Sequence, residues 1–324
     1  MNILITGCSG FIGFHLSKYL LENTNHKIFG IDNLNNYYDV NLKKDRLKIL
    51  KEIKNKKTSF VFSKIDIKNN SLLKKNFLKN KYNIVIHLAA QAGVRYSILD
   101  PSTYFENNIQ GFFNILEASR IFKVKHLLFT STSSVYGNNK NFPLREDFNT
   151  DKPLSFYAAS KKTNEVMAYS YSNIYKMPLT GMRFFTVYGP YGRPDMFLFK
   201  YVKSIFSKQK ISIFNHGKHE RDFTYVSDVV ESIFRLISKP SKDKIPFQVL
   251  NIGNGKPEKL FSFMRTIEKF LNKKANTSLV KMQKGDVGKT HADISNLKKK
   301  ISYKPKIKTI DGINKFITWY KEYY

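Results

Sequence analysis

A tyrosine and a lysine four residues apart, downstream of a run of hydroxyl residues, are the side chains of this sequence best suited to chemistry. Tyr157 and Lys161 fall in a segment with helical spacing, so both project from one face of a helix. A nearby ammonium group favours the phenolate of a tyrosine, whose ordinary pKa of about 10 makes it a poor base at neutral pH. Thr132 lies in the run Ser131 to Ser134, after an apolar strand-like stretch, and could orient the proton. Tyr157, Lys161 and Thr132 are therefore the predicted catalytic residues, for acid/base chemistry coupled to hydride transfer at a carbinol carbon.

A glycine-rich turn near the N-terminus indicates where a hydride acceptor would bind. Gly7, Gly10 and Gly13 lie three apart, between an apolar run at 2–6 and a helical pattern at 14–21. This spacing allows a tight turn, close approach of a pyrophosphate, and close packing of the helix on the strand. Asp32 ends the next predicted strand, nineteen residues after Gly13. A carboxylate there binds the adenosine ribose hydroxyls and repels a 2′-phosphate, so the pattern predicts NAD rather than NADP.

Predicted strands and helices alternate through the first 186 residues. The apolar runs at 27–31, 60–65, 84–88, 126–130 and 179–185 are predicted strands, and helical patterns cover 101–122 and 155–175. The alternation predicts an α/β fold of the Rossmann type with a doubly wound parallel sheet. We expect residues 1–186 to form the NAD-binding domain, joined by a later crossover segment at about 223–252, and residues 187–324 to form a smaller substrate-binding α/β lobe. The site should lie between them, outside the carboxyl ends of the strands.

The chain is strongly basic, with 55 lysines and arginines against 25 acidic residues and a formal net charge of +30 over 324 residues. A large positive field attracts polyanions, so a nucleic-acid-associated or nucleotide-sensing protein without catalysis is the alternative from another functional class. Only nine of the basic residues are arginine, which bidentate readers of bases and phosphates favour, and the lysines are scattered, with short runs at 54–57 and 298–300. We therefore expect solvated lysine surfaces and no nucleic-acid partner.

Cysteine usage and hydropathy indicate a cytoplasmic protein without a membrane partner. The one cysteine, Cys8, excludes an internal disulfide and fits a reducing compartment. The chain enters an apolar strand without a leader, and no apolar run approaches the roughly 18 residues of a membrane span. His216 and His219 lie near Glu220 and Asp222, but their spacing matches no metal motif, so we expect no metal.

Longer blocks of the sequence resemble one enzyme family over essentially the full length. The glycine turn and the Tyr157 to Lys161 segment are similar to those of extended short-chain dehydrogenases/reductases of the NAD-dependent epimerase/dehydratase type. Within that superfamily the chain resembles the UDP-glucuronate 4-epimerases. This narrower resemblance is carried by the blocks Asp32 to Val40, Ala89 to Ser97, Arg183 to Pro190, Gly192 to Met196, Phe214 to Lys218, Arg221 to Val226 and Gly285 to Val287.

The resemblance implies an isomerase that binds NAD tightly and recycles it within one turnover. It would interconvert UDP-glucuronate and UDP-galacturonate for polysaccharide biosynthesis, by C4 oxidation, rotation of the 4-keto intermediate and re-reduction, as a homodimer packed through the helices at 101–122 and 155–175. The implied cofactor site contains Gly7, Gly10, Phe11, Ile12, Gly13, Asp32, Asn33, Asp66, Ile67, Leu88, Ala89, Ala90, Gln91, Asn107, Tyr157, Lys161, Phe184 and Val187. The implied substrate site contains Arg95, Thr132, Ser133, Ser134, Thr186, Arg193, Arg221 and Asp286.

Ser133 and Ser134 distinguish the implied reaction from those of related enzymes. In the UDP-glucuronate decarboxylases and nucleotide-sugar 4,6-dehydratases, which are related to the 4-epimerases that the chain resembles, an acidic residue or an Asp-Glu pair takes these positions. Hydroxyls here, joined by Thr186, can hold a substrate carboxylate by hydrogen bonds, whereas an acid would repel it. The alternatives are a 4-epimerase of UDP-glucose or another neutral UDP-sugar and, less favoured, a UDP-glucuronate decarboxylase. The stretch 287–293 departs from the family pattern at the nucleotide end.

Overall fold

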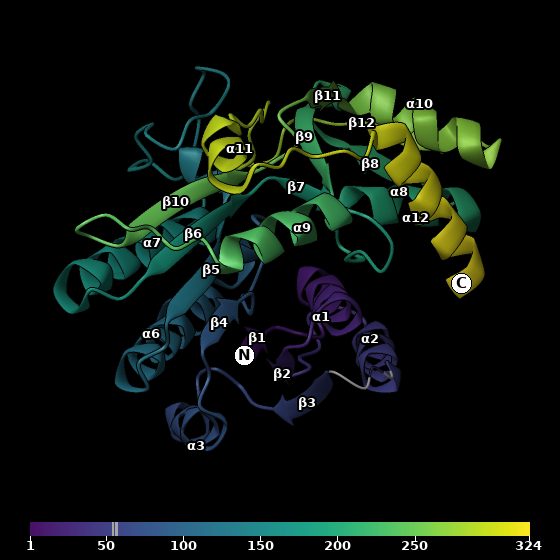
Figure 1. The fold of residues 1–324 in the computed structure, drawn as a ribbon. Coiled ribbons are helices and arrows are strands. Elements are labelled where there is room, and N and C mark those ends of the chain that lie inside the picture. The colour runs from purple at the N-terminus through teal and green to yellow at the C-terminus, as the bar shows by residue number, and fades with distance from the viewer. Residues whose placement is uncertain (54, 56–57) are drawn as a thin grey trace.

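A seven-stranded parallel sheet forms the centre of the protein in a computed structural model that describes residues 1–53, 55 and 58–324 (Figure 1). The lysines of the 54–57 run lie outside the described residues. The strand order β10-β6-β5-β4-β1-β2-β3 confirms the predicted Rossmann-type α/β fold. The strands are β1 (Asn2–Thr6), β2 (Lys27–Asp32), β3 (Ser59–Lys64), β4 (Ile84–His87), β5 (His126–Thr132), β6 (Leu179–Phe184) and β10 (Phe247–Ile252).

Helices cover both faces of this sheet (Figure 1). One face packs against α1 (Phe11–Asn23), α2 (Val40–Glu52) and α9 (Val226–Ile237), and the other against α3 (Asn70–Asn80), α6 (Gly111–Ile121) and α7 (Phe156–Tyr175). Side chains alternate between these layers, since Leu128 belongs to the first core and Leu127 and Phe129 to the second. Every residue of β4, β5 and β6 is buried, which explains why Ile84–Ile86 and Leu127–Phe129 are apolar without alternation.

The helix expected over 101–122 is interrupted in the structure. It consists of α5 (Pro101–Tyr104), a π-helical turn η1 (Phe105–Gln110) and α6, and the short helix α4 (Tyr96–Leu99) precedes it. The wide turn places Asn108 against the loop after β4, where its Oδ1 accepts from the Gln91 amide at 2.8 Å and its Nδ2 donates to the Gln91 carbonyl at 2.9 Å. Such π turns inside helices occur often at functional sites.

The chain beyond β6 contributes strands to two small sheets and crosses back to the large sheet once, at β10, before β11 and β12 complete the small ones. One small sheet joins β11 (Pro257–Lys259), β9 (Glu220–Tyr225) and β7 (Thr186–Tyr188), and the other joins β12 (Thr277–Leu279) to β8 (Ile211–Ile213). Around them lie α8 (Phe197–Ser207), η3 (Phe214–Gly217), α10 (Leu260–Leu271), α11 (Ser295–Ile301) and α12 (Thr309–Tyr323). The division into two domains near residue 186 stays a prediction. Of the helices in the described chain, none has the length and apolar character that a bilayer crossing requires.

Candidate active site

A cavity of about 810 Å³ opens at the carboxyl ends of the parallel strands. Its lining includes residues at or just after the ends of β1, β2, β4, β5 and β6, together with residues of α8, η3 and β9. Every residue that the sequence assigned to a catalytic, cofactor or substrate role lines this cavity except Asp66. Its carboxylate accepts a hydrogen bond at 3.1 Å from Nδ2 of Asn33, which does line the cavity. The structure thus brings the predicted residues together, while the role of each one stays a prediction.

The glycine turn closes tightly between β1 and α1. Gly7 has a φ of +71°, and a Cβ there would lie 2.8 Å from the Ala89 amide nitrogen. A Cβ on Gly13 would lie 2.1 Å from the Gly7 carbonyl oxygen, so α1 can approach the turn only with glycine at this position. Gly10 and the first residues of α1 line the cavity, which leaves the helix N-terminus available to an anion such as a pyrophosphate.

Asp32, at the end of β2, lines the part of the cavity predicted to bind the adenosine ribose. Its Oδ2 accepts from the Ser9 amide at 3.1 Å, and its Oδ1 accepts from the Leu34 amide at 2.8 Å. Burial raises the pKa of Asp32, although these amides and the charge of Lys43 oppose the shift. The sequence reasoning missed Lys43, which lines the cavity and donates to the Asn35 carbonyl and side-chain oxygens at 2.6 Å each, because α2 was not predicted.

Thr6 joins the end of β1 to the loop after β4. Its Oγ1 accepts from the amides of Leu88 at 3.1 Å and Ala89 at 3.0 Å, and lies 2.8 Å from Nδ1 of His87. The cavity-lining backbone at Leu88 and Ala89 is thereby held to the start of the glycine turn. Sequence reasoning missed this contact because it depends on β1 and β4 being neighbours, which the chain order alone does not specify.

Tyr157 and Lys161 lie in the first turns of α7, which begins where Ser155 Oγ accepts from the Ala158 amide at 3.2 Å. Lys161 is 1% exposed and its Nζ has no hydrogen-bond partner within the described chain; burial lowers its pKa to about 7. Burial also raises the pKa of Tyr157, against the opposing effects of Thr132 and Arg193. The expected phenolate is therefore not favoured by this protein alone, because desolvation outweighs the nearby charges. A buried amine without a partner fits a cofactor ribose, whose hydroxyls could accept its hydrogen bonds.

Hydroxyl residues from two neighbouring strand ends line the same cavity. Thr132 ends β5 and caps the short helix η2 (Ser133–Tyr136): its Oγ1 accepts from the Ser134 amide at 3.2 Å and donates to the Ser134 hydroxyl at 3.3 Å. Thr186 begins β7 just after β6, the strand that pairs with β5. Together with Ser133 these residues give the cavity a set of neutral donors suited to a carboxylate.

Two arginine–aspartate pairs lie in the cavity wall. Arg193 binds Asp195 through Nε at 3.0 Å and through a terminal nitrogen at 2.5 Å, and Tyr37 donates to the same carboxylate at 3.3 Å. Arg221 binds Asp286 at 2.9 Å. Sequence reasoning named both arginines and Asp286 but missed Asp195 and Tyr37 as cavity residues, although both stand in blocks that carry the family resemblance.

Further cations give this wall an excess of positive charge. The Arg95 guanidinium lies over the ring of Phe214 at 4.6 Å, and Lys200 of α8 also lines the cavity. Burial lowers the pKa of both side chains. His219, also missed, lies with Nε2 3.4 Å from Oδ2 of Asp286. The pKa of Asp286 is lowered because His219 and Arg221 outweigh its burial, so it stays ionised. A positive wall with arginine forks suits a diphosphate.

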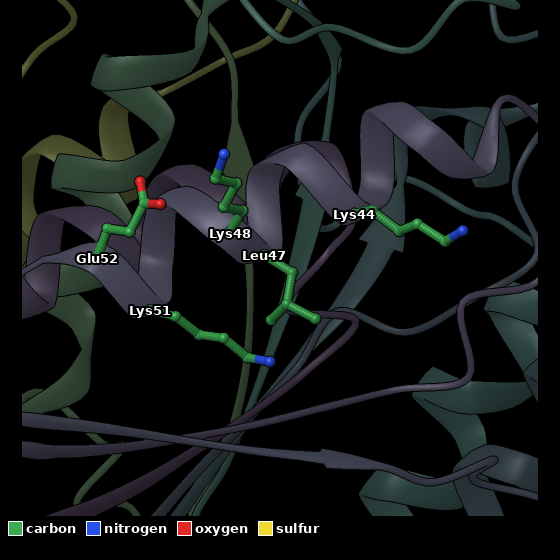
Figure 2. A pocket seen from close by; sticks show the side chains of 5 residues that line it. All are labelled: Lys44, Leu47, Lys48, Lys51 and Glu52. Carbon is green, nitrogen blue, oxygen red and sulfur yellow. The ribbon is translucent and has the colours of Figure 1, made fainter.

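A second depression, of about 420 Å³, lies on the surface of α2 (Figure 2). It is lined by Lys44, Leu47, Lys48, Lys51 and Glu52, and Figure 2 shows that all of these side chains extend from one helix. None of these five described residues also lines the main cavity. Long side chains on a helix surface produce such hollows without a ligand, and we assign it no role.

Lys161 should make the stability of the ligand-free protein depend on pH. Its pKa is about 7 when folded and near the ordinary 10.5 when unfolded, so between these values the unfolded chain binds more protons and the free energy of unfolding rises with pH. Lys161→Met should therefore raise the melting temperature at pH 7 by a few degrees, an advantage that disappears near pH 10. Thermal unfolding followed by circular dichroism measures this. Lys162→Met, on the same helix, is the control, and an advantage for Lys161→Met that does not change with pH would contradict the prediction.

Similar proteins are consistent with this geometry. A model of the NAD dependent epimerase/dehydratase family matches residues 3–253. The chain is 48% identical to Protein CapI of Staphylococcus aureus, covering 100% of this chain and 99% of that protein, and 40% identical to the probable UDP-glucuronate 4-epimerase of Rhizobium meliloti, covering 100% and 98%. The crystal structure of UDP-glucuronic acid 4-epimerase from Bacillus cereus, in complex with UDP-glucuronic acid and NAD, superposes with a TM-score of 0.91 at 33% identity over 100% of both chains. The chain therefore belongs to the NAD dependent epimerase/dehydratase family.

Proposed function

We propose that this protein is an isomerase that interconverts UDP-glucuronate and UDP-galacturonate by inverting C4 of the sugar. The observation that carries the proposal is that Ser133, Ser134 and Thr186 line the same cavity as Tyr157 and Lys161, so carboxylate-binding hydroxyls and a proton-transfer pair share one site. The names of relatives at 40% identity over nearly the whole chain support the same substrate.

Bound NAD would accept a hydride from C4 and return it to the opposite face. The residues suited to hold it are those of the glycine turn, the Asp32 carboxylate for the adenosine ribose, and Lys161 for the ribose near the reacting carbon. The buried Nζ of Lys161, which has no partner in the described chain, would donate hydrogen bonds to the ribose hydroxyls.

Tyr157 is the group that moves the proton. It takes the proton of the C4 hydroxyl as C4 is oxidised to a ketone and returns it when C4 is reduced. Because burial raises its pKa, the tyrosine needs additional positive charge to act as a base at neutral pH. Lys161, four residues away, would supply that charge once ribose hydroxyls accept hydrogen bonds from its ammonium group and so favour the charged form. Thr132 lowers the pKa of Tyr157 by hydrogen bonding and orients its hydroxyl toward the sugar.

The neutral hydroxyls protect the intermediate from losing its carboxylate. A 4-keto uronate is a β-keto acid, which decarboxylates readily. The carboxylate can accept hydrogen bonds from Ser133, Ser134 and Thr186, which hold it while the 4-keto sugar is in the site. None of these side chains is acidic, so none repels the carboxylate. The charged wall of Arg95, Lys200 and Arg221 would hold the diphosphate during the rotation.

Product analysis tests the proposal directly. The purified protein is incubated separately with UDP-glucuronate, UDP-glucose and UDP-N-acetylglucosamine, and the products are identified by NMR. We expect UDP-galacturonate from the first, without carbon dioxide as a main product. A pentose nucleotide as the major product, or faster epimerisation of either neutral sugar, would overturn the assignment.

A homodimer formed through α6 and α7 is part of the proposal. The two helices lie side by side and are open on the outside of the molecule (Figure 1), where Phe113 and Ile121 of α6 and Val166, Tyr169 and Ile174 of α7 are 42% to 63% exposed. An apolar patch of this kind is unusual on a monomer and suits a two-fold interface in which the same helices meet. Light scattering should give a particle mass of twice the 37.8 kDa chain mass, and the Val166→Asp variant should have the mass of a single chain.

We also propose a cytoplasmic location, on the basis of cysteine usage. Cys8 is the one cysteine of the chain, and it is free and buried in the glycine turn. The fold therefore uses no disulfide, as is usual in a reducing compartment.

A further inference from the structure

We propose that Glu165 is a positioning residue that fixes the carboxylate-binding hydroxyls relative to Tyr157 and Lys161, and so prevents decarboxylation of the 4-keto intermediate. The inference rests on the proposed function. It concerns a buried carboxylate that neither lines the cavity nor entered the sequence reasoning.

Glu165 connects α7 to the ends of two strands. It lies four residues after Lys161, on the same side of the helix, and is 4% exposed. Its Oε1 accepts from the Ser131 hydroxyl at 2.6 Å and from Nε of Arg183 at 2.8 Å, and its Oε2 accepts from a terminal nitrogen of Arg183 at 2.8 Å. Ser131 and Arg183 are register partners in β5 and β6. One carboxylate therefore holds both strands to the helix that carries the proton-transfer pair.

The residues that bind the substrate carboxylate follow directly from these two anchored positions. Thr132 is the next residue after Ser131 and caps η2, which contains Ser133 and Ser134. Thr186 follows three residues after Arg183. Any shift of the two strand ends relative to α7 would move the hydroxyls relative to Tyr157.

Arg183 also contacts η2 directly. Its guanidinium lies over the ring of Tyr136, the last residue of η2, at 4.8 Å. The Tyr136 hydroxyl donates to Oδ1 of Asn251 at 2.7 Å, and a terminal nitrogen of Arg183 donates to the Glu146 carbonyl at 3.2 Å. The planar guanidinium thus makes a two-point contact with Glu165 and a face contact with Tyr136, which a lysine could not do. The connection runs without a break from the catalytic helix to the hydroxyl residues.

A fixed orientation has a chemical consequence for this substrate. In the 4-keto uronate, the C5–C6 bond breaks when it lies perpendicular to the plane of the C4 ketone. Its electron pair then forms the C4–C5 enolate, carbon dioxide leaves, and C5 takes a proton, so no further oxidant or reductant is needed. A carboxylate held at a fixed angle to the ketone is kept out of that alignment, and a loosened one reaches it more often.

The buried ion pair between Glu165 and Arg183 is better explained by positioning of the strand ends than by a gain in stability. Taking both charges out of water opposes much of their attraction, so a buried ion pair is weak evidence for stability. Removing one partner is costly, since the other is left buried and unpaired. Variants that keep the ion pair while loosening a single contact are therefore the informative ones.

Ser131→Ala is the sharpest test because it leaves Glu165 and Arg183 paired. It removes one hydroxyl that donates to a buried carboxylate at 2.6 Å. Tyr303→Phe is the control for the loss of such a hydrogen bond, because it removes a hydroxyl that donates to buried Asp228, also at 2.6 Å. Tyr303 and Asp228 do not line the cavity, whereas Ser131 does. Each purified enzyme is incubated with UDP-glucuronate. Carbon dioxide and UDP-galacturonate are measured together with the KM, the kcat, the affinity for UDP and the melting temperature.

We expect Ser131→Ala to raise the ratio of carbon dioxide to UDP-galacturonate about tenfold, with KM for UDP-glucuronate rising more than kcat falls and the affinity for UDP unchanged. Tyr303→Phe should lower the melting temperature to a similar extent and leave the ratio unchanged. Glu165→Asp keeps the charge but shortens the reach, and should act in the same direction as Ser131→Ala; if it fails to fold, Ser131→Ala decides.

The outcomes separate this inference from the proposed function. If the wild-type enzyme makes UDP-galacturonate and the Ser131→Ala ratio equals that of wild type or of Tyr303→Phe, the positioning role is overturned and the epimerase activity stands. If the wild-type enzyme makes no UDP-galacturonate, the proposed function fails and this inference fails with it.

Discussion

Tyr157→Phe should lower the rate of UDP-galacturonate formation about 10³-fold, within the range that a positioned acid or base contributes. The change removes the one hydroxyl that we assign to the C4 proton and keeps the ring, which contacts Tyr104 edge to face with the ring centroids 6.0 Å apart. The lost interaction operates only while the proton moves, so kcat should fall while KM changes little. Steady-state kinetics with UDP-glucuronate measures both constants.

Tyr169→Phe provides the matched control on the same helix. Tyr169 is 49% exposed and its ring contacts Phe247, away from the cavity. Loss of its hydroxyl should leave kcat within twofold of wild type. A Tyr157→Phe variant that keeps more than a tenth of the wild-type kcat would mean that another group moves the proton.

Local spacing explains which parts of the site were predictable. Gly7, Gly10 and Gly13 lie in one turn, and Tyr157 and Lys161 lie in one helix. Their spacing in the sequence was therefore enough to predict that the members of each group are neighbours. The parallel sheet followed from the alternation of strands and helices, which the strand order confirms. A recognisable local spacing was therefore enough to predict these features, whereas α2, without such a spacing, was not predicted.

Contacts between distant segments could not be predicted in this way. Glu165 stands only four residues after Lys161, yet its function depends on Ser131 and Arg183, which become neighbours only when β5 pairs with β6. Thr6 and His87 meet across β1 and β4 for the same reason. The burial of Lys161 was not predictable either: the sequence places it four residues from Tyr157, but the depth of burial, which lowers its pKa to about 7, is a property of the packed structure.

Ser133→Asp should nearly abolish turnover of UDP-glucuronate, because it places a negative charge where we expect the substrate carboxylate. Two like charges about 4 Å apart in a partly buried site repel by about 4 kcal/mol, which corresponds to a loss of about 10³-fold in kcat/KM. Ser133 lines the cavity and is partly exposed to it, so an aspartate can be accommodated without disrupting the core. The prediction is checked with UDP-glucuronate kinetics at low and at high salt, where screening should restore little of a loss that arises inside the cavity.

Ser133→Asn is the control that isolates charge from shape. Asparagine matches the size of aspartate but remains neutral and can still donate a hydrogen bond, so it should cost no more than about tenfold. The affinity of both variants for UDP, which lacks the uronate, should equal that of wild type, since the repulsion requires the carboxylate. Equal losses for Asp and Asn would show that Ser133 only fills space, and the carboxylate would then have to be bound elsewhere in the cavity, with Arg193 the first candidate because it is a cation that lines it.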